Sequence, residues 1–369
     1  MDINGIMQRL PYYLDAGITV SIVGASGIGK TDAVYQTIEK LEKRDGHEWG
    51  RCTQYPIFYN PSDVIGYLGL GEQEIIDEQQ RKVLAQVSIF SQPPWMVSDD
   101  GRQMNGFKRG VVIFDEDDKA QPDVKKALAP VKLYRRVQRW ALHAGIGIVC
   151  IANDDSGRHG STKDFDFEIN RKHILRATTS VRGWMEWADK NKVDPLFKAF
   201  AEDHVETVFS GKLPEKQGPF CTPRSLVSFS KVAKFMMDPD GRITDKDGFI
   251  EGANGAIGGP AARDLVTYFD TREEVPTWAE IVKDPGRAKV SQSAAAQMMS
   301  AHICAHNVDA KTCEQAVRYA KRLRPEFHIV FARSATQRDF MLVNHEAFEK
   351  WTDDEPQLVA LLNALGGVA

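Results

Sequence analysis

A glycine-rich segment between two regular elements constrains the fold of this chain most strongly. Residues 24–31 read Gly-Ala-Ser-Gly-Ile-Gly-Lys-Thr, which fits the spacing G-x-x-x-x-G-K-[ST]. A β-type run over residues 17–23 precedes the segment, and residues 32–44 follow it with apolar side chains at helical spacing. A strand that turns through glycines directly into a helix begins a βαβ unit, so the sequence predicts an α/β fold with a parallel sheet.

The same segment predicts a phosphate site. Glycines let backbone N–H groups curl around a phosphate, and the helix N-terminus adds partial positive charge. We expect Lys30 to reach the β- and γ-phosphates of a nucleotide and the Thr31 hydroxyl to bind Mg²⁺. ATP and Mg²⁺ are therefore the expected ligands. The residues predicted to hold the nucleotide are Gly24, Ala25, Ser26, Gly27, Ile28, Gly29, Lys30 and Thr31.

Two acidic residues follow a buried β-type run further along the chain. The run Val-Val-Ile-Phe over residues 111–114 is followed by Asp115 and Glu116. An acid at such a strand end can hold Mg²⁺, and a second acid can orient and activate an attacking water. We predict Asp115 as a metal ligand and Glu116 as the residue that activates water, so the site would hydrolyse ATP. Because Asp117 and Asp118 continue the run, the alternative is a solvated acidic turn.

Another buried run, over residues 148–152, ends in Asn153. Ligands of open α/β sheets bind at the carboxyl ends of the strands. The Asn153 amide is therefore a candidate to bind the γ-phosphate or the attacking water. On local grounds, an asparagine that begins a turn before Asp154 is an equal alternative.

The character of the sequence changes near residue 185. Before it, apolar runs alternate with helical patterns, and further strands are predicted at residues 55–59, 110–114, 145–152 and 173–177. After it, helices are predicted at 262–269, 294–306 and 313–322, with one strand at 327–331. We expect two domains: an α/β nucleotide-binding core over residues 1–185, and a mostly helical C-terminal lid over residues 186–369.

Composition excludes several classes of protein. The formal net charge of -4 removes any overall electrostatic argument for nucleic-acid binding. No apolar run approaches the roughly 18 residues that a membrane span needs, and the N-terminus lacks the apolar region of a secretory signal. The 5 cysteines are odd in number and scattered, which favours a reducing compartment and predicts a cytoplasmic protein.

Together these motifs resemble an AAA+ ATPase, and within that superfamily the MoxR-type and dynein-related branch. The further stretches that carry the resemblance are residues 60–66, Pro94-Trp95, residues 115–124, residues 169–171 and residues 222–226. The resemblance covers residues 1–230 and is looser over residues 250–369, where similarity to phage and bacterial relatives is faint.

The resemblance implies roles for individual residues. Asn153 falls on sensor 1, and Arg171 on the arginine finger, which in the family reaches the γ-phosphate in the neighbouring subunit. Arg176 is the alternative finger because it lies close by in sequence, and Arg158 is a further one. Asn60, at the end of the second predicted strand, matches a polar residue that can restrain the catalytic glutamate.

Arg224 falls on sensor 2, which in the family couples the nucleotide to the lid. It begins a helix just after Pro223, where a cation is unfavourable to the helix dipole unless an anion offsets it. This position favours a phosphate contact over a surface role.

The resemblance also implies an assembly and partners. The family works as a remodelling motor of chaperone type, usually as a homo-oligomeric hexameric ring, and often with a von Willebrand factor A domain protein or another adaptor. Since few residues precede the first predicted strand, we expect client contacts through core loops, the C-terminal part or an adaptor. No membrane partner is expected.

Basic residues near position 136 leave a second function open. Pro130 is expected to end or kink the helix that follows the acid pair, which leaves residues 132–139 to form a hairpin. In that hairpin Arg136 and Arg139, with Arg135 and Trp140 beside them, are residue types that bind single-stranded nucleic acid. A solvated hairpin or a subunit contact is commoner, so a nucleic-acid-associated AAA+ motor or loader is the alternative function.

His302 and His306 have the i, i+4 spacing of a helical metal pair. No further paired ligands stand near them in sequence, so we expect ordinary helix-face residues here rather than a metal site.

Overall fold

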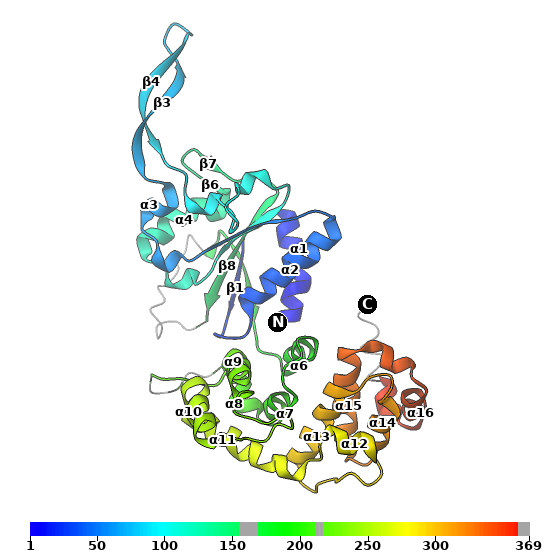
Figure 1. Cartoon of the computed structure of the whole chain (residues 1–369). Coiled ribbons are helices and arrows are strands. Elements are labelled where there is room, and N and C mark those ends of the chain that lie inside the picture. Colours follow the sequence, from blue (N-terminus) through cyan, green and yellow to red (C-terminus); the bar gives the residue numbers. More distant parts are fainter. Residues whose placement is uncertain (155–168, 212–213, 215–216, 361–369) are drawn as a thin grey trace. The chain divides into compact units, whose positions relative to one another are not determined.

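The computed structural model describes residues 1–154, 169–211, 214 and 217–360 (Figure 1). The chain divides into two compact units, Met1–Thr178 and Thr179–Ala369. Within the described ranges, none of the helices combines the length and the apolar character that a membrane crossing requires.

The first unit is built on a five-stranded sheet with the order β2-β5-β8-β1-β9, and all its strand pairs are parallel. The strands are β1 (Val20–Gly24), β2 (Gly50–Gln54), β5 (Gly110–Phe114), β8 (Ile146–Asn153) and β9 (His173–Ala177). Every residue of β5 is buried, as a strand covered on both faces requires. The predicted α/β phosphate-loop core is confirmed, and so is the helical C-terminal part.

Helices cover both faces of this sheet (Figure 1). The covering helices are α1 (Ile3–Ala16), α2 (Lys30–Asp45), α3 (Pro61–Ile65) and α4 (Pro122–Tyr134). In β5, Val111 and Ile113 pack in one core with α1 and α2, whereas Val112 and Phe114 pack in the other with α3 and α4. Alternate residues of a strand point to opposite faces, so one apolar run serves both cores. Each buried side chain of this size contributes about 1.5–3 kcal/mol.

Two predicted strands are wrong. The second strand ends at Gln54, and Pro56–Phe58 form a 3₁₀ turn instead. Pro56 has no N–H to donate to a ladder, which disfavours it inside a sheet. Residues 327–331 lie in helix α15 (Pro325–Arg338), which Pro325 begins at its first turn. A short apolar run does not distinguish a strand from a buried helix by periodicity alone.

Helix α4 does not end at Pro130, one of the two predicted outcomes, but continues to Tyr134. Leu128 and Val131 are fully buried on either side of the proline, and their packing offsets the hydrogen bond that proline cannot make. A small hairpin follows, but later than the predicted residues 132–139: residues 132–134 belong to α4, and the strands are β6 (Arg136–Val137) and β7 (Trp140–Ala141).

An antiparallel arm extends from the first unit, and the sequence analysis did not identify it. Its strands are β3 (Leu68–Ile76) and β4 (Lys82–Phe90), which pair along their whole length and project beyond the sheet (Figure 1). Leu70 and Leu84 are 74% and 73% exposed. A two-stranded ribbon without a covering layer has no buried face, which explains why its apolar side chains remain in solvent.

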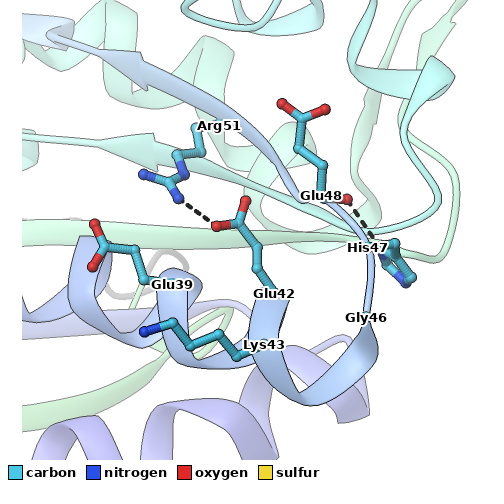
Figure 2. Close-up of a pocket in the computed structure, with 7 residues that line it drawn as sticks. All are labelled: Glu39, Glu42, Lys43, Gly46, His47, Glu48 and Arg51. Carbon is cyan, nitrogen blue, oxygen red and sulfur yellow. Dashed lines mark hydrogen bonds and ion pairs between the residues drawn. The ribbon is translucent and has the colours of Figure 1, made fainter.

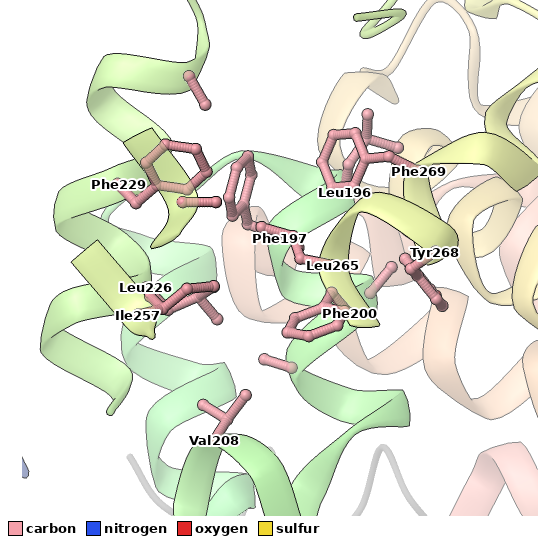
Figure 3. Close-up of a cluster of buried hydrophobic side chains, with 14 of the residues drawn as sticks. Leu196, Phe197, Phe200, Val208, Leu226, Phe229, Ile257, Leu265, Tyr268 and Phe269 are labelled. Carbon is pink, nitrogen blue, oxygen red and sulfur yellow. The ribbon is translucent and has the colours of Figure 1, made fainter. Parts of the chain in front are cut away.

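The second unit is helical. Its helices are α6 (Val181–Lys190), α7 (Pro195–Asp203), α8 (Val205–Phe209), α9 (Pro223–Ala233), α10 (Lys246–Ile257), α11 (Gly259–Asp270), α12 (Trp278–Lys283), α13 (Ala294–Asn307), α14 (Cys313–Ala320), α15 and α16 (Glu346–Asp354). They form two apolar cores. Figure 3 shows the first, where the ring of Phe197 meets Phe229 and Phe269 edge-on at centroid distances of 5.9 and 5.2 Å.

Candidate nucleotide site

The glycines of the phosphate loop are required by its backbone. Gly27 and Gly29 have φ angles of 75° and 90°, which side-chain-bearing residues rarely adopt. A Cβ atom on Gly24 would lie 2.4 Å from the carbonyl oxygen of Ala177 on the neighbouring strand. The turn from β1 into α2 therefore needs glycine at each of these positions.

Lys30 lies across this loop with its ammonium group saturated by oxygen. Its Nζ donates to the carbonyl oxygens of Gly24 and Ala25, each at 2.8 Å, and to Asn153 Oδ1 at 2.9 Å. The contact with Asn153 follows from the strand order, since β8 adjoins β1 and Asn153 pairs with Gly24 in register. The first α2 residue and the last β8 residue thus meet at the carboxyl edge of the sheet.

Thr31 and Asp115 form the second contact of this edge. Thr31 Oγ1 donates to Asp115 Oδ2 at 2.9 Å, and Asp115 Oδ1 accepts the N–H of Glu116 at 2.9 Å. A hydroxyl and a carboxylate side by side are the oxygen ligands that Mg²⁺ accepts. The two residues therefore fit the predicted magnesium role. Among the described residues, no group of three His, Cys, Asp or Glu side chains is arranged to hold a metal by itself.

Glu116 adopts a left-handed backbone conformation with φ 55° and ψ 36°. For a residue with a side chain this costs on the order of 1–3 kcal/mol and persists only when the surroundings enforce it. Its carboxylate accepts from Lys119 Nζ at 2.7 Å, and the side chain is 38% exposed. Glu116 is therefore held at the water-accessible rim. The partner Lys119 was missed, although its i, i+3 spacing was visible in the sequence.

The next two acids are not a solvated turn. Asp117 is 1% exposed and Asp118 is 9% exposed. Asp118 Oδ1 accepts the backbone N–H of Asn153 at 3.2 Å, and burial raises the pKa of its carboxyl group. The acidic run thus divides into a pair at the site and a pair inside the protein, and the solvated-turn alternative is wrong for the second pair.

Arg171 and Arg176 lie at opposite ends of β9. The strand begins at His173, which pairs with Val20, and ends at Ala177, which pairs with Gly24. At about 3.3 Å per residue, roughly 13 Å separate these two levels. Arg171 precedes the strand and is remote from the phosphate loop of its own unit. Arg176 lies near that loop and pairs with Asp154 at 3.1 Å.

The outcome differs among three other residues of the predicted site. Arg224 is an exposed residue in the first turn of α9, in the second unit, so its contact with a nucleotide stays a prediction. Arg158 lies outside the described residues. The premise for Asn60 is wrong, because β2 ends at Gln54 and Asn60 caps α3, where its N–H donates to Asp63 at 2.7 Å.

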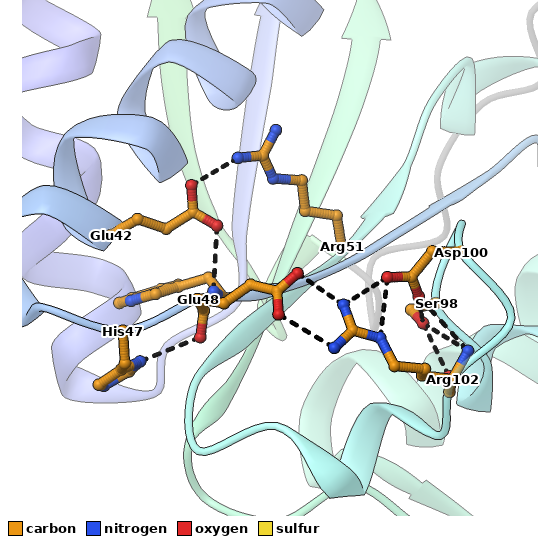
Figure 4. A network of polar contacts seen from close by, with 8 residues as sticks. Glu42, His47, Glu48, Arg51, Ser98, Asp100 and Arg102 are labelled. Carbon is orange, nitrogen blue, oxygen red and sulfur yellow. Dashed lines mark hydrogen bonds and ion pairs between the residues drawn. The ribbon is translucent and has the colours of Figure 1, made fainter.

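A shallow depression lies at the other end of α2, away from Lys30 (Figure 2). Its lining is Glu39, Glu42, Lys43, Gly46, His47, Glu48 and Arg51. Beside it, Arg102 joins Glu48 and Asp100 in an exposed network (Figure 4). Ion pairs as exposed as these contribute little to stability, because water and salt screen them. The depression is thus separate from the phosphate loop.

His302 is a buried core histidine. Its Nε2 lies 2.9 Å from Glu202 Oε2, and the side chain is fully buried. This pairing agrees with the expectation that His302 and His306 are ordinary residues of their helix.

No protein-family model matches this sequence, and no curated protein matches it. The backbone is distantly similar to many solved structures, among them the following three. A Cytophaga hutchinsonii protein, assigned provisionally as an ATPase, is 11% identical, with 98% of this chain and 88% of that chain covered and a TM-score of 0.33. A point mutant of Thermotoga maritima RuvB is 12% identical, with 77% and 76% covered and a TM-score of 0.39. Brucella abortus NtrX is 12% identical, with 98% and 67% covered and a TM-score of 0.33.

Proposed function

We propose that this chain is an ATP hydrolase of the AAA+ type. The observation that carries the proposal is the convergence of three strand ends. Lys30 reaches Asn153 at 2.9 Å, and Thr31 reaches Asp115 at 2.9 Å. Phosphate binding, metal binding and water activation need these residue types at one edge of a parallel sheet.

Each residue of this edge has a distinct task in the proposed reaction. Lys30 and the backbone N–H groups of the loop bind the phosphates. Mg²⁺, held by Thr31 and Asp115, would neutralise charge on the phosphates. Glu116 accepts a proton from the attacking water, and Asn153 orients that water or the γ-phosphate.

A cation for the γ-phosphate comes from a second subunit in this proposal. Arg171 lies at the amino end of β9, whereas Lys30 and Asn153 lie at the carboxyl edge. An arginine so far from its own loop is suited to a neighbouring loop. We therefore propose a homo-oligomeric ring, a hexamer by resemblance, in which Arg224 reports the nucleotide state to the helical unit. A MoxR-like remodelling task with a von Willebrand factor A domain protein or another adaptor is part of the same proposal.

Two substitutions test the division of tasks. Lys30→Ala should abolish nucleotide binding measured by calorimetry, because the phosphates lose their cation. Glu116→Gln should keep nucleotide affinity and lower kcat by about 10²–10⁴, the range for loss of a general base. Lys40→Ala removes an exposed lysine from the same helix and is the matched control, with no expected effect on either quantity. Equal loss of affinity in Lys30→Ala and Glu116→Gln would contradict the proposal.

The β6–β7 hairpin favours the second candidate, a nucleic-acid-associated motor. Arg136 and Arg139 are exposed, and the Arg139 guanidinium lies 5.3 Å from the ring centre of Trp140. Stacked arginine and tryptophan are suited to bases of a single strand. ATPase assays with and without single-stranded DNA distinguish the two candidates, since stimulation that disappears in Arg139→Glu supports the nucleic-acid function.

A further inference from the structure

A buried carboxylate beside the site joins two lysines from distant parts of the first unit. Lys132 Nζ lies 2.8 Å from Asp117 Oδ1 and donates to Asp117 Oδ2 at 3.0 Å, and Lys172 Nζ donates to the same Oδ2 at 3.3 Å. The three side chains are 1%, 1% and 2% exposed. Taking such charges out of water is costly, so breaking a buried pair by removing one partner is strongly unfavourable. The cluster therefore fixes the segments that carry it.

Those segments are the ones the proposed reaction uses. Asp117 directly follows Glu116, and Lys172 directly follows Arg171. The third member, Lys132, belongs to α4. Its carbonyl oxygen accepts from the hydroxyl of Thr19, the residue just before β1, at 2.5 Å. One carboxylate thus connects the residue that activates water with the segment of the finger, and α4 anchors both to the sheet.

The backbone conformation of Glu116 explains why this residue needs to be held in place. Its left-handed conformation, with φ 55°, is one that a glutamate does not adopt unless its neighbours hold it. Asp117 is the adjacent residue, and its side chain is fixed by two ammonium groups. Asp118, the next residue, accepts the N–H of Asn153. The turn that presents Glu116 is therefore held from its buried side.

We propose that Asp117 is a positioning residue for ATP hydrolysis. It holds Glu116 for the site of its own subunit and, through Lys172, the Arg171 segment for the site of the neighbouring subunit. The inference rests on the proposed function. It adds to that function that one side chain holds Glu116 for one site and Arg171 for the adjacent site.

Two matched variants separate positioning from packing. Lys172→Met and Lys132→Met each remove one ammonium group from the same carboxylate. Both should keep ATP affinity within twofold. Lys172→Met should lower kcat at least tenfold, because it releases the Arg171 segment from Asp117. Lys132→Met should lower kcat less than threefold, because Lys172 still holds both Asp117 and that segment. Lys172→Arg should restore most of the loss. Equal losses in both methionine variants, or an unchanged kcat in Lys172→Met, would overturn the proposal.

Mixing of subunits gives a result that a merely structural role does not produce. Lys172→Met subunits keep an intact Glu116, so mixing with Glu116→Gln subunits should restore activity where that glutamate faces an intact Arg171. Mixing with Arg171→Ala subunits should restore nothing. Asp117→Asn, with its ATP affinity retained, should be restored by neither partner, because it affects both halves.

The same mixtures show which idea fails. If Arg171→Ala subunits restore the activity of Lys172→Met, the role of Lys172 is overturned. The same holds if neither partner restores it. If Arg171→Ala and Glu116→Gln themselves restore nothing when their subunits exchange, the shared site of the proposed function fails instead.

Discussion

The two units each bury charged side chains, but they use them differently. In the first unit, Asp117 connects segments that carry the proposed reacting groups. In the second, Glu202 accepts from Arg333 Nη2 at 2.7 Å and lies 2.9 Å from His302. Those three residues belong to α7, α15 and α13, whose other inward residues are largely apolar. We therefore propose that the first cluster positions reacting groups, whereas the second fixes how helices pack.

The electrostatics of the second cluster support this difference. Burial raises the pKa of Glu202, but the hydrogen bond from His302 and the charge of Arg333 outweigh it and bring the pKa to about 2. Lys198 and Asp189 form a further buried pair at 2.5 Å between α7 and α6. Charges held this firmly among helices contribute to the uniqueness of the packing, and breaking them should change stability rather than catalysis.

The largest expected effect is on catalysis, at Arg171, whose segment we propose that the first cluster positions. Arg171→Ala should lower kcat by about 10³–10⁵ without weakening ATP binding, because a finger acts on transition-state charge. Arg176→Ala, a change at the other end of β9, is the matched control and should lower kcat less than tenfold. Steady-state assays with ATP titrations measure both. High activity in Arg171→Ala would remove this residue from the site.

The next largest effect is on the stability of the second unit. Glu202→Gln leaves the partly buried Arg333 and the fully buried His302 without their carboxylate, and breaking a buried pair costs at most about 3–5 kcal/mol. Hydrogen exchange of α13 and α15 in the whole chain should accelerate accordingly, while ATP affinity changes little. Glu206→Gln, at an exposed position on the next helix, is the control. Unchanged exchange in Glu202→Gln would contradict the structural role of this cluster.

Lowering the pH should reduce the stability of the second unit, because two of its histidines become protonated on unfolding. Burial lowers the pKa of His306 to about 4, with Lys198 and Arg338 adding to the effect, and burial also lowers the pKa of His302. Between about pH 6.5 and 4 the unfolded state binds more protons than the folded state, so stability falls as pH falls. The loss at partly exposed His306 is about 1–2 kcal/mol.

Hydrogen exchange of α13 at pH 7.5, 6 and 5 measures this loss, after correction for the intrinsic exchange rate. His306→Asn should flatten the dependence, and an unaltered slope would show that another group is responsible. In the first unit, burial raises the pKa of Asp118, so its contribution to stability changes with pH in the opposite direction. There the folded state binds more protons above pH 3.8, and this contribution to stability falls as pH rises through the folded pKa.

The smallest effect is expected where the charges are exposed. Arg102 pairs with Glu48 and Asp100 on the surface of the first unit (Figure 4). Arg102→Ala should leave the free energy of unfolding almost unchanged, and 0.5 M salt should remove any difference that remains. Chemical denaturation at two salt concentrations measures this. A loss of several kcal/mol would mean that exposure is a poor guide to the energy of these clusters.

The local sequence determined the elements whose signals are complete within a few residues. The glycine spacing before Lys30 and Thr31 predicted the loop and its helix, and the uninterrupted apolar run before Asp115 predicted a strand covered on both faces. Strands over residues 110–114 and 173–177 have the predicted bounds. Such features are decided by backbone conformation and side-chain periodicity, which short segments carry by themselves.

Tertiary structure decided which of several consecutive residues of the same type are buried and which lie at the site. Asp115, Glu116, Asp117 and Asp118 are consecutive acids, yet only the first two lie at the site. Asp117 is buried because lysines 15 and 55 positions further along the chain supply its counter-charges. The apolar run at 327–331 is helical and packs in a helical core, whereas the β3–β4 residues stay largely exposed because they belong to no apolar core of the described residues. Burial and charge pairing depend on which distant segments meet, and no local pattern contains that information.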